Sequence, residues 1–222
     1  MLIKIFLIFL TLTLSLKAED IPIIVIAPSK QAQSISTVGS SVTVFTEADL
    51  ENSTEIFLQD VINYGAPGMT VYQSGGAGTQ SGVQLRGLPK RYTTIYVDGV
   101  KQSDPSTVSN DYYFDDLMKS SVSRVEVLRG NQSSIYGSGA MGGTVNITTK
   151  KGKKGFHKDY NLTTGSEQTF NFSGSISGAD ETKDFWLGYE KFQTDGESAM
   201  TDNEETDSYH NDTFVGNFGY KL

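Results

Sequence analysis

The sequence predicts a compact α+β unit followed by antiparallel strands of the kind that span a membrane as a β-barrel. Three observations support this fold class. An apolar stretch opens the chain, residues 42–150 alternate short strand patterns with turns and two helix patterns, and residues 156–222 repeat an apolar–polar alternation. The 23 glycines, 12 Phe and 11 Tyr are typical of a β protein rich in turns and aromatic side chains.

Composition excludes several classes of function. The 222 residues include 18 Lys and Arg against 26 Asp and Glu, a formal charge of −8, whereas a nucleic-acid-binding protein normally needs a basic surface. Without cysteine there is no disulfide, thiol nucleophile or cysteine-based metal site. The two histidines, His157 and His210, argue against a histidine-built metal centre.

Residues 1–18 have the pattern of a signal peptide. Lys4 supplies a positive start, residues 5–16 are mostly apolar, and Ala18 offers a small residue for cleavage. As a helix, 5–16 would span about 18 Å, short of the ~30 Å hydrocarbon core of a bilayer. We therefore expect export, with an uncleaved membrane anchor as the alternative.

Residues 19–41 combine a β-prone segment with a polar linker. The segment lies between Pro22 and Pro28, which oppose a helix. It fits two interpretations equally well on chemistry alone: a strand that adds to the sheet edge of a partner, or the first core strand of the next domain. Its residues are Ile23, Ile24, Val25, Ile26 and Ala27.

Residues 42–150 read as one α+β unit. A strand over 42–45 precedes a short helix over 47–50, which Thr46 can cap together with Asp49. Asn52 can cap a second helix, over 54–64, whose apolar stripe is Phe57, Leu58, Val61 and Ile62. Further strands are expected over 70–72, 83–85, 93–97, 122–128 and 144–149, with a hairpin turn at 98–99.

Two glycine-rich motifs do not predict nucleotide binding. Residues 137–142 match G-x-G-x-x-G, but a β-prone run follows them, so no helix N-terminus would meet a phosphate. Residues 75–82 lack the Lys-Ser/Thr pair of a phosphate-binding loop. We interpret both as turns and predict no enzymatic activity and no catalytic residues.

The tail predicts about four strands with one apolar and one polar face. Phe170, Phe172 and Ile176 alternate with polar residues, and so do Phe214, Phe218 and Tyr220 with the residues between them. In the strand pattern between these two, Trp186 interrupts the polar face. This is the repeat of a transmembrane β-barrel. A soluble sandwich shares the two-residue period, but the aromatic content and the export signal favour the barrel.

Several motifs, at their mutual spacing, resemble the plug domain of TonB-dependent outer-membrane receptors. The similarity runs in register from about Ile21 to the end of the chain. Gly75-Gly-Ala-Gly78 and the early barrel strands are most similar to the cobalamin receptor. The motifs are Gln84-Leu-Arg-Gly87, Ile95-Tyr-Val-Asp-Gly-Val100, Val125-Glu-Val-Leu-Arg-Gly130 and Ser134-Ile-Tyr-Gly-Ser-Gly-Ala-Met-Gly-Gly-Thr-Val-Asn-Ile147.

The resemblance implies energised import of cobalamin or an iron–siderophore across the outer membrane of a Gram-negative bacterium. It implies a plug over 42–150 and the start of a 22-stranded barrel over 156–222. Residues 23–27 match the TonB box, which decides the open choice in favour of strand addition to TonB, itself driven by ExbB–ExbD. Because four strands cannot close a barrel, we expect an incomplete receptor. The alternative is a soluble periplasmic plug-like binding module without transport activity.

The candidate site residues fall into three groups. Arg86 and Arg129 each follow an apolar strand and precede glycine, so we expect both to be buried and to latch the plug to barrel carboxylates; ordinary surface arginines are the alternative. The resemblance implies ligand contacts at Gln80, Gly82, Pro89, Thr107 and Val108, to which Arg91 and Tyr92 add positive charge and an aromatic face. It also places a calcium site, or else a solvated acidic loop, at Asp195, Asp202, Glu204, Glu205 and Asp207.

Overall fold

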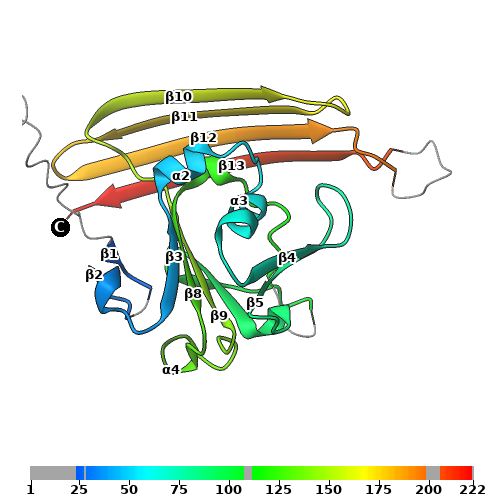
Figure 1. Cartoon of the computed structure of the whole chain (residues 1–222). Helices are drawn as coiled ribbons and strands as arrows, with labels where there is room; N and C mark the ends of the chain where they lie inside the picture. The colour runs from blue at the N-terminus through cyan, green and yellow to red at the C-terminus, as the bar shows by residue number, and fades with distance from the viewer. Residues whose placement is uncertain (1–23, 28, 108–111, 199–205, 222) are drawn as a thin grey trace, which may run out of the picture.

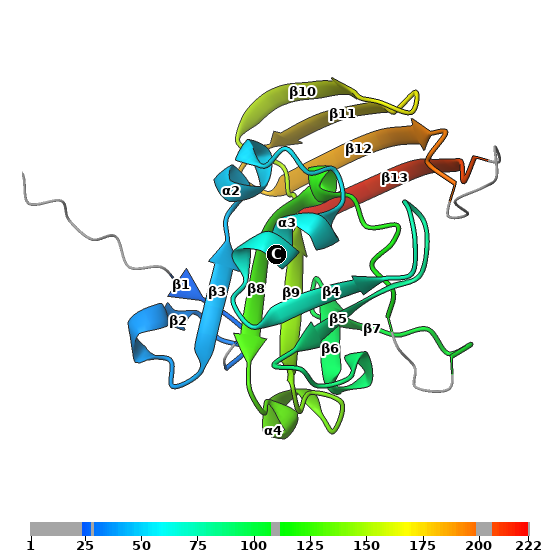
Figure 2. The ribbon, with the colours of Figure 1, turned by 45° about the vertical axis from the view of Figure 1, so that its right-hand side comes forward.

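The computed structural model describes residues 24–27, 29–107, 112–198 and 206–221, which form two layers (Figure 1). An α+β unit contains a five-stranded sheet, and a four-stranded antiparallel sheet lies across it, over α2 (Glu47–Asn52) and α3 (Leu58–Gly65). The strands of the two sheets run in very different directions (Figure 2). The predicted fold class, an α+β unit followed by antiparallel strands, is confirmed.

The five-stranded sheet supplies the core of the α+β unit. Its strand order is β3-β8-β9-β6-β7, and β6 and β9 are parallel, whereas the other neighbours are antiparallel. Alternate residues of the central strands, among them Val125 and Ile147, face α3 and are buried. The strands are β3 (Ser41–Phe45), β6 (Thr93–Val97), β7 (Val100–Gln102), β8 (Val122–Arg129) and β9 (Gly143–Thr149).

The first helix follows its sequence signal and the second does not. In α2 the Thr46 hydroxyl accepts from the Asp49 N–H at 3.3 Å, and the Asp49 carboxylate accepts from the Thr46 N–H at 2.8 Å, which confirms the capping box. The second helix, α3, was expected from residue 54 but begins at Leu58. Tertiary pairing explains the difference, because Phe57 forms a β-bridge with Met118 and the Leu58 N–H donates to the Leu117 carbonyl.

The remaining elements of the unit are short. The motif at 137–142 is a turn that leads into β9, as expected. Among the described residues, no helix is long and apolar enough to cross a membrane. The short elements are β1 (Ile24–Val25), β2 (Gln33–Ser34), η1 (Ile35–Thr37), the hairpin of β4 (Met69–Gln73) and β5 (Ser81–Leu85), η2 (Lys90–Tyr92), η3 (Lys119–Ser121) and α4 (Ser133–Tyr136).

The four-stranded sheet turns one face to the α+β unit and one face outward. Its strands are β10 (Gly155–Thr164), β11 (Phe170–Ala179), β12 (Lys183–Thr194) and β13 (Tyr209–Tyr220), paired in that order. Trp186 interrupts the polar face because it points inward, where it is buried. The outward face carries exposed Phe156, Tyr160, Leu162, Phe172, Ile176, Leu187, Phe214, Phe218 and Tyr220.

Candidate functional site

The N-terminal segment, residues 24–27, is docked on the α+β unit. Its strand β1 pairs antiparallel with β2, Ile24 opposite Ser34 and Val25 opposite Gln33. Val25 is 0% exposed and Ala27 is 3% exposed. Of the residues predicted to add to a partner's sheet, 24–27 are therefore already held within their own chain, and Ile23 lies outside the described residues.

A single carboxylate receives the backbone of the N-terminal segment. Glu126, in the middle of β8, accepts the N–H of Ala27 at 2.7 Å and the N–H of Ile26 at 3.0 Å. The Arg124 Nε donates to the same carboxylate at 2.7 Å. Glu126 is only 4% exposed, and a buried carboxylate is tolerated when donors of this kind surround it.

A tyrosine hydroxyl holds the other side of the same segment. The Tyr136 hydroxyl donates to the Ala27 carbonyl at 2.5 Å. The Tyr136 ring packs edge-to-face against Tyr96, with the centroids 5.0 Å apart. Burial raises the pKa of Tyr136 to about 12, so the hydroxyl keeps its proton and remains a donor at neutral pH.

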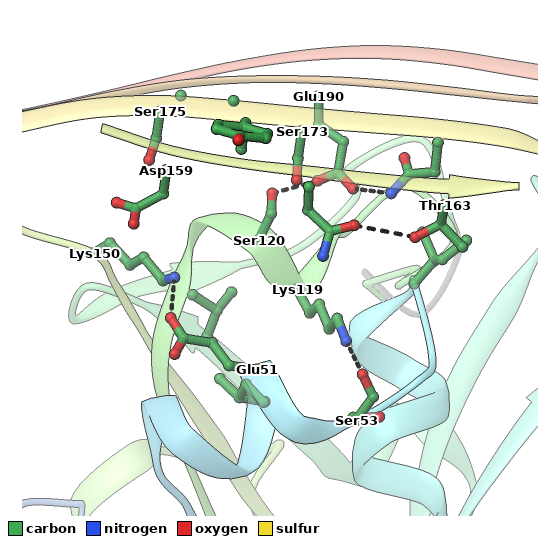
Figure 3. Close-up of a pocket in the computed structure, with 18 of the residues that line it drawn as sticks. Glu51, Ser53, Lys119, Ser120, Lys150, Asp159, Thr163, Ser173, Ser175 and Glu190 are labelled. Atoms are coloured by element: carbon green, nitrogen blue, oxygen red, sulfur yellow. Dashed lines mark hydrogen bonds and ion pairs between the residues drawn. The ribbon is translucent and has the colours of Figure 1, made fainter. Parts of the chain in front are cut away.

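A polar cavity of about 380 Å³ separates the α+β unit from the four-stranded sheet (Figure 3). Glu190 of β12 points into it, accepts from Asn171 at 2.9 Å, and also accepts a short hydrogen bond from the Ser120 hydroxyl. From the other side, the Lys119 ammonium donates to the Ser53 carbonyl. Hydroxyl, amide and charged groups therefore face each other across this interface.

An apolar contact lies beside that polar region. Phe57 of the unit packs edge-to-face on Phe192 of β12, with ring centroids 5.1 Å apart, and Met118 completes the cluster. Tyr209 of β13 packs against the same rings, and its hydroxyl donates to the Asp116 carboxylate at 2.5 Å. The two layers are thus joined by side-chain packing as well as by hydrogen bonds.

An ion-pair cluster joins α2 to the segment between β9 and β10. The Lys150 ammonium lies 3.0 Å from the Glu51 carboxylate and 3.4 Å from that of Glu47. The Lys153 ammonium lies 3.0 Å from the Glu47 carboxylate. Partial burial opposes ionisation of Glu47, but the hydrogen bond from Lys153 and the charge of Lys150 outweigh it and lower the pKa of Glu47.

The two arginines predicted to act as a latch are neighbours with different environments. Arg129 is 9% exposed, and its Nη1 donates to the Pro67 carbonyl at 2.5 Å, while its Nε is buried without a hydrogen-bond partner in the described part of the chain. Burial, and then the charge of Arg86, lower the pKa of Arg129. Arg86 is exposed in the described part of the chain, and the expected burial of both arginines against the barrel wall stays a prediction. The backbone of Arg86 is left-handed, with φ 54°.

Part of the predicted ligand set comes together around Lys90. A Cβ on Gly82 would lie 2.7 Å from Lys90 Cδ, and the Lys90 ammonium stands 4.3 Å from the centroid of the Tyr113 ring. Pro89 directly precedes η2, in which the Arg91 guanidinium lies 4.9 Å from the Tyr92 ring centroid. Cationic and aromatic groups therefore gather at this loop.

The other predicted contacts lie in separate turns. The Gln80 carbonyl accepts from the Ser74 hydroxyl at 2.9 Å, which closes the tip of the β4–β5 hairpin. The Thr107 hydroxyl donates to the Asp104 carbonyl at 2.9 Å, and Val108 lies outside the described residues. Whether these turns and the Lys90 loop share a ligand stays a prediction.

The predicted calcium loop is described only in part. Asp195 accepts from the Gln168 amide at 2.5 Å, and Gly196 lies against the backbone of Asp207. Asp202, Glu204 and Glu205 lie outside the described residues. The described residues contain no group of three or more acidic, His or Cys side chains arranged to hold a metal ion, and calcium binding stays a prediction.

Sequence reasoning missed Glu126, Tyr136 and Glu190. A signal for Glu126 was present, since it is an acidic residue within the apolar run Val125–Leu128 and a buried carboxylate must find donors. Glu190 sits on the polar face of its strand pattern, where nothing distinguishes a solvated residue from one that meets a second layer. Tyr136 lies in a short helix that has no hydrophobic periodicity by which the sequence could predict it.

The fold and the geometry of the two layers agree with a known family. The family described as TonB-dependent Receptor Plug Domain matches residues 34–144. The chain belongs to this family of TonB-dependent receptor plug domains.

Particular proteins and solved structures are also similar to this chain. The "Iron-regulated outer membrane virulence protein" of Vibrio cholerae serotype O1 is 31% identical over 172 residues, covering 70% of this chain and 26% of the relative. The chain thus spans about a quarter of the length of that curated relative. Among solved structures, Pseudomonas aeruginosa FpvA bound to a pyoverdine–iron complex matches with a TM-score of 0.72 at 19% identity, covering 90% of this chain and 25% of that one. The alcaligin outer-membrane receptor FauA from Bordetella pertussis matches with a TM-score of 0.71 at 21% identity, covering 90% and 32%.

Proposed function

We propose that this chain serves in the TonB-dependent import of an iron–siderophore across the outer membrane of a Gram-negative bacterium. The observation that carries the proposal is the combination of a plug-family unit with a sheet whose far face is apolar, aromatic and exposed. A soluble periplasmic module would expose those aromatic side chains to water at a cost that burial in lipid removes. An iron–siderophore is favoured as cargo because the relatives named above include an iron-regulated outer-membrane protein and siderophore receptors.

In this proposal residues 23–27 are the strand that TonB takes up, with ExbB–ExbD as the energy source. The segment is β-prone and short, and its backbone can pair with a sheet edge once it leaves β2. The direct test is calorimetric titration of a peptide covering residues 21–28 into the C-terminal domain of TonB. A peptide with Val25→Pro is the matched control, because proline removes a ladder donor and should abolish binding. Equal affinity of both peptides, or none for either, would refute strand addition.

The cargo is tested by growth. A strain that lacks its own iron–siderophore receptors should grow on an iron–siderophore when it carries the full-length gene of this protein and a functional TonB. Cobalamin is the second candidate, favoured by the similarity of Gly75-Gly-Ala-Gly78, a loop that contacts Tyr209 of β13. Rescue by cobalamin alone would replace the siderophore assignment.

Arg86 and Arg129 are proposed to latch the plug to carboxylates of the barrel. The buried, unpaired Nε of Arg129 supports this, because a donor in that position requires an acceptor. Replacing both arginines with alanine should loosen the plug, measured as faster proteolysis of the plug in outer-membrane preparations. An unchanged proteolysis rate would show ordinary surface arginines.

A further inference from the structure

The outward face of the four-stranded sheet carries an aromatic row near one of its ends. This end contains the start of β10, the start of β12 and the end of β13 (Figure 1). The strand register places Phe156, Phe185 and Phe218 at one level across the sheet, with Gly178 of β11 between the first two. Aromatic side chains at one level are typical of the depth at which the hydrocarbon of a bilayer meets its headgroups.

Two lysines accompany this row on the outward face. Lys158 follows Phe156 by two residues in β10, and Lys183 precedes Phe185 by two residues in β12, so the alternation of each strand turns both lysines outward. Both are exposed. The Lys158 ammonium stands 5.4 Å from the centroid of the Phe156 ring. Because Phe156 is nearer than Lys158 to the end of the sheet, the Lys158 side chain is bent back towards that end.

The acidic residues of the strands at this end face the other way. They are Asp159 of β10 and Asp184 of β12, and the alternation of each strand places both on the inward face. Asp159 lines the polar cavity beside the α+β unit (Figure 3). In the adjoining turn, the Asp180 carboxylate accepts the backbone N–H groups of residues 182 and 183. The strands therefore present positive charge to the outside at this end and keep their negative charge inside.

The opposite end of the outward face has a different charge pattern. Lys191 of β12 lies directly opposite Asp212 of β13, and both alternate onto the outward face. The Asp212 carboxylate also accepts from the Tyr189 hydroxyl at 2.6 Å. Lys191 therefore has a negative charge beside it within the sheet, whereas none of the described acidic residues of the four strands faces outward beside Lys158 or Lys183.

We propose that Lys158 and Lys183 bind the phosphate groups of anionic phospholipid headgroups and so fix the depth of the sheet in the membrane. The backbone of Lys158 lies level with apolar residues, since it pairs with Ile176, which in turn pairs with Leu187. An ammonium group at that level is costly in hydrocarbon unless its long side chain carries it to the headgroups. The bend over Phe156 does this, and phosphate is an anion that lysine binds well. The proposal deepens the proposed function and rests on it for the membrane location.

The test measures how much more strongly the intact chain binds anionic vesicles than neutral ones. The two kinds of vesicle are phosphatidylcholine alone and phosphatidylcholine with about 30% phosphatidylglycerol, and the bound fraction is measured by flotation at low ionic strength. The ratio of the two partition coefficients isolates the part that depends on charge, because the apolar face contributes to both. Lys158→Gln and Lys183→Gln should each lower this ratio about fivefold, and the double variant should combine the two effects.

Lys191→Gln is the matched control, because it removes the same charge from the same face of the sheet, at the end where Asp212 lies opposite. It should leave the ratio unchanged. A second variant, with Lys158→Arg and Lys183→Arg together, keeps both charges and should keep the preference for anionic vesicles. The arginine variant therefore separates a lost phosphate contact from a lost fold.

An unchanged ratio in the double glutamine variant would overturn the proposal, as would an unaltered chain without any preference for anionic vesicles. An equal fall in Lys191→Gln would show a general attraction of positive charge and no contact specific to this end. Displacement by inorganic phosphate, beyond that by chloride at equal ionic strength, would reassign the two lysines to a soluble anion. Because the readout involves neither TonB nor cargo, failure here leaves the peptide titration and growth tests of the proposed function standing, and failure of those tests leaves this one standing.

Discussion

Glu126 and Ala27 are 99 positions apart in the sequence, and the carboxylate of one accepts the backbone N–H of the other at 2.7 Å. This contact ties the start of the described chain to the centre of the main sheet. It places a charge-assisted hydrogen bond, among the stronger kinds in proteins, at the point where a partner is proposed to pull. The contacts between the two layers and within α2 lead to four further predictions.

Phe192→Ala should weaken the attachment of the four-stranded sheet to the α+β unit. Phe192 is 4% exposed and packs on Phe57, and truncating a buried Phe typically costs about 3 kcal/mol. For a chain of this size we expect a fall in melting temperature of about 6–12 °C, followed by near-UV circular dichroism in detergent micelles. Phe214→Ala, on the outward face at 79% exposure, is the control and should change it by less than a quarter as much.

Gly78→Ala should destabilise the contact between the β4–β5 hairpin and β13. Gly78 has φ +76°, and an added Cβ would lie 2.1 Å from the Tyr209 ring. The left-handed backbone alone costs an L-residue about 1–2 kcal/mol. The free energy of unfolding of each variant is measured by urea titration. Gly76→Ala is the control and should be close to neutral, because nothing lies within 4 Å of a Cβ added there. In a Tyr209→Ala background part of the Gly78→Ala cost should disappear, and strict additivity would contradict the proposed clash.

Thr46→Ala should remove the hydroxyl half of the capping box of α2, while the backbone N–H of residue 46 can still donate to Asp49, and should cost about 1 kcal/mol in the free energy of unfolding at neutral pH. Hydrogen bonds from the Thr46 side chain and backbone lower the pKa of Asp49. A lowered folded-state pKa contributes stability above the ordinary value of 3.8, and this contribution is lost as the pH falls through the folded-state pKa. The difference between wild type and variant should therefore shrink in acid. A difference that is constant from pH 7 to pH 2.5 would speak against the carboxylate's part in the cap.

Glu47→Gln should loosen the attachment of the β9–β10 connection to α2 by a small amount. Glu47 lies near both Lys150 and Lys153, and partly exposed ion pairs of this kind contribute about 0.5 kcal/mol after solvent screening. Because the pKa of Glu47 is lowered, this contribution is present above its ordinary value of 4.5 and is lost as the pH falls. Unfolding titrations in 1 M NaCl should show little difference between variant and wild type, since salt screens the pairs.

Short-range patterns predicted most of the elements. The capping box of Thr46 and Asp49, the turn at Asp98-Gly99 and the alternation in β11 to β13 all depend on neighbours within a few residues, and they are found as expected. The start of α3 was wrong because Phe57 pairs with Met118, 61 positions away in the numbering, and no local pattern contains that partner.

By itself the sequence determined the fold class, the inward and outward faces of the last strands and the family, because periodicity, caps and motif spacing are local or ordered along the chain. Only the tertiary structure decided which polar residues meet. The Glu126 carboxylate accepts the backbone N–H groups of Ile26 and Ala27. The side chains of Trp186 and Glu190 line the cavity next to the α+β unit. Such contacts join segments far apart in the sequence, and their partners follow from how the layers pack rather than from any nearby residue.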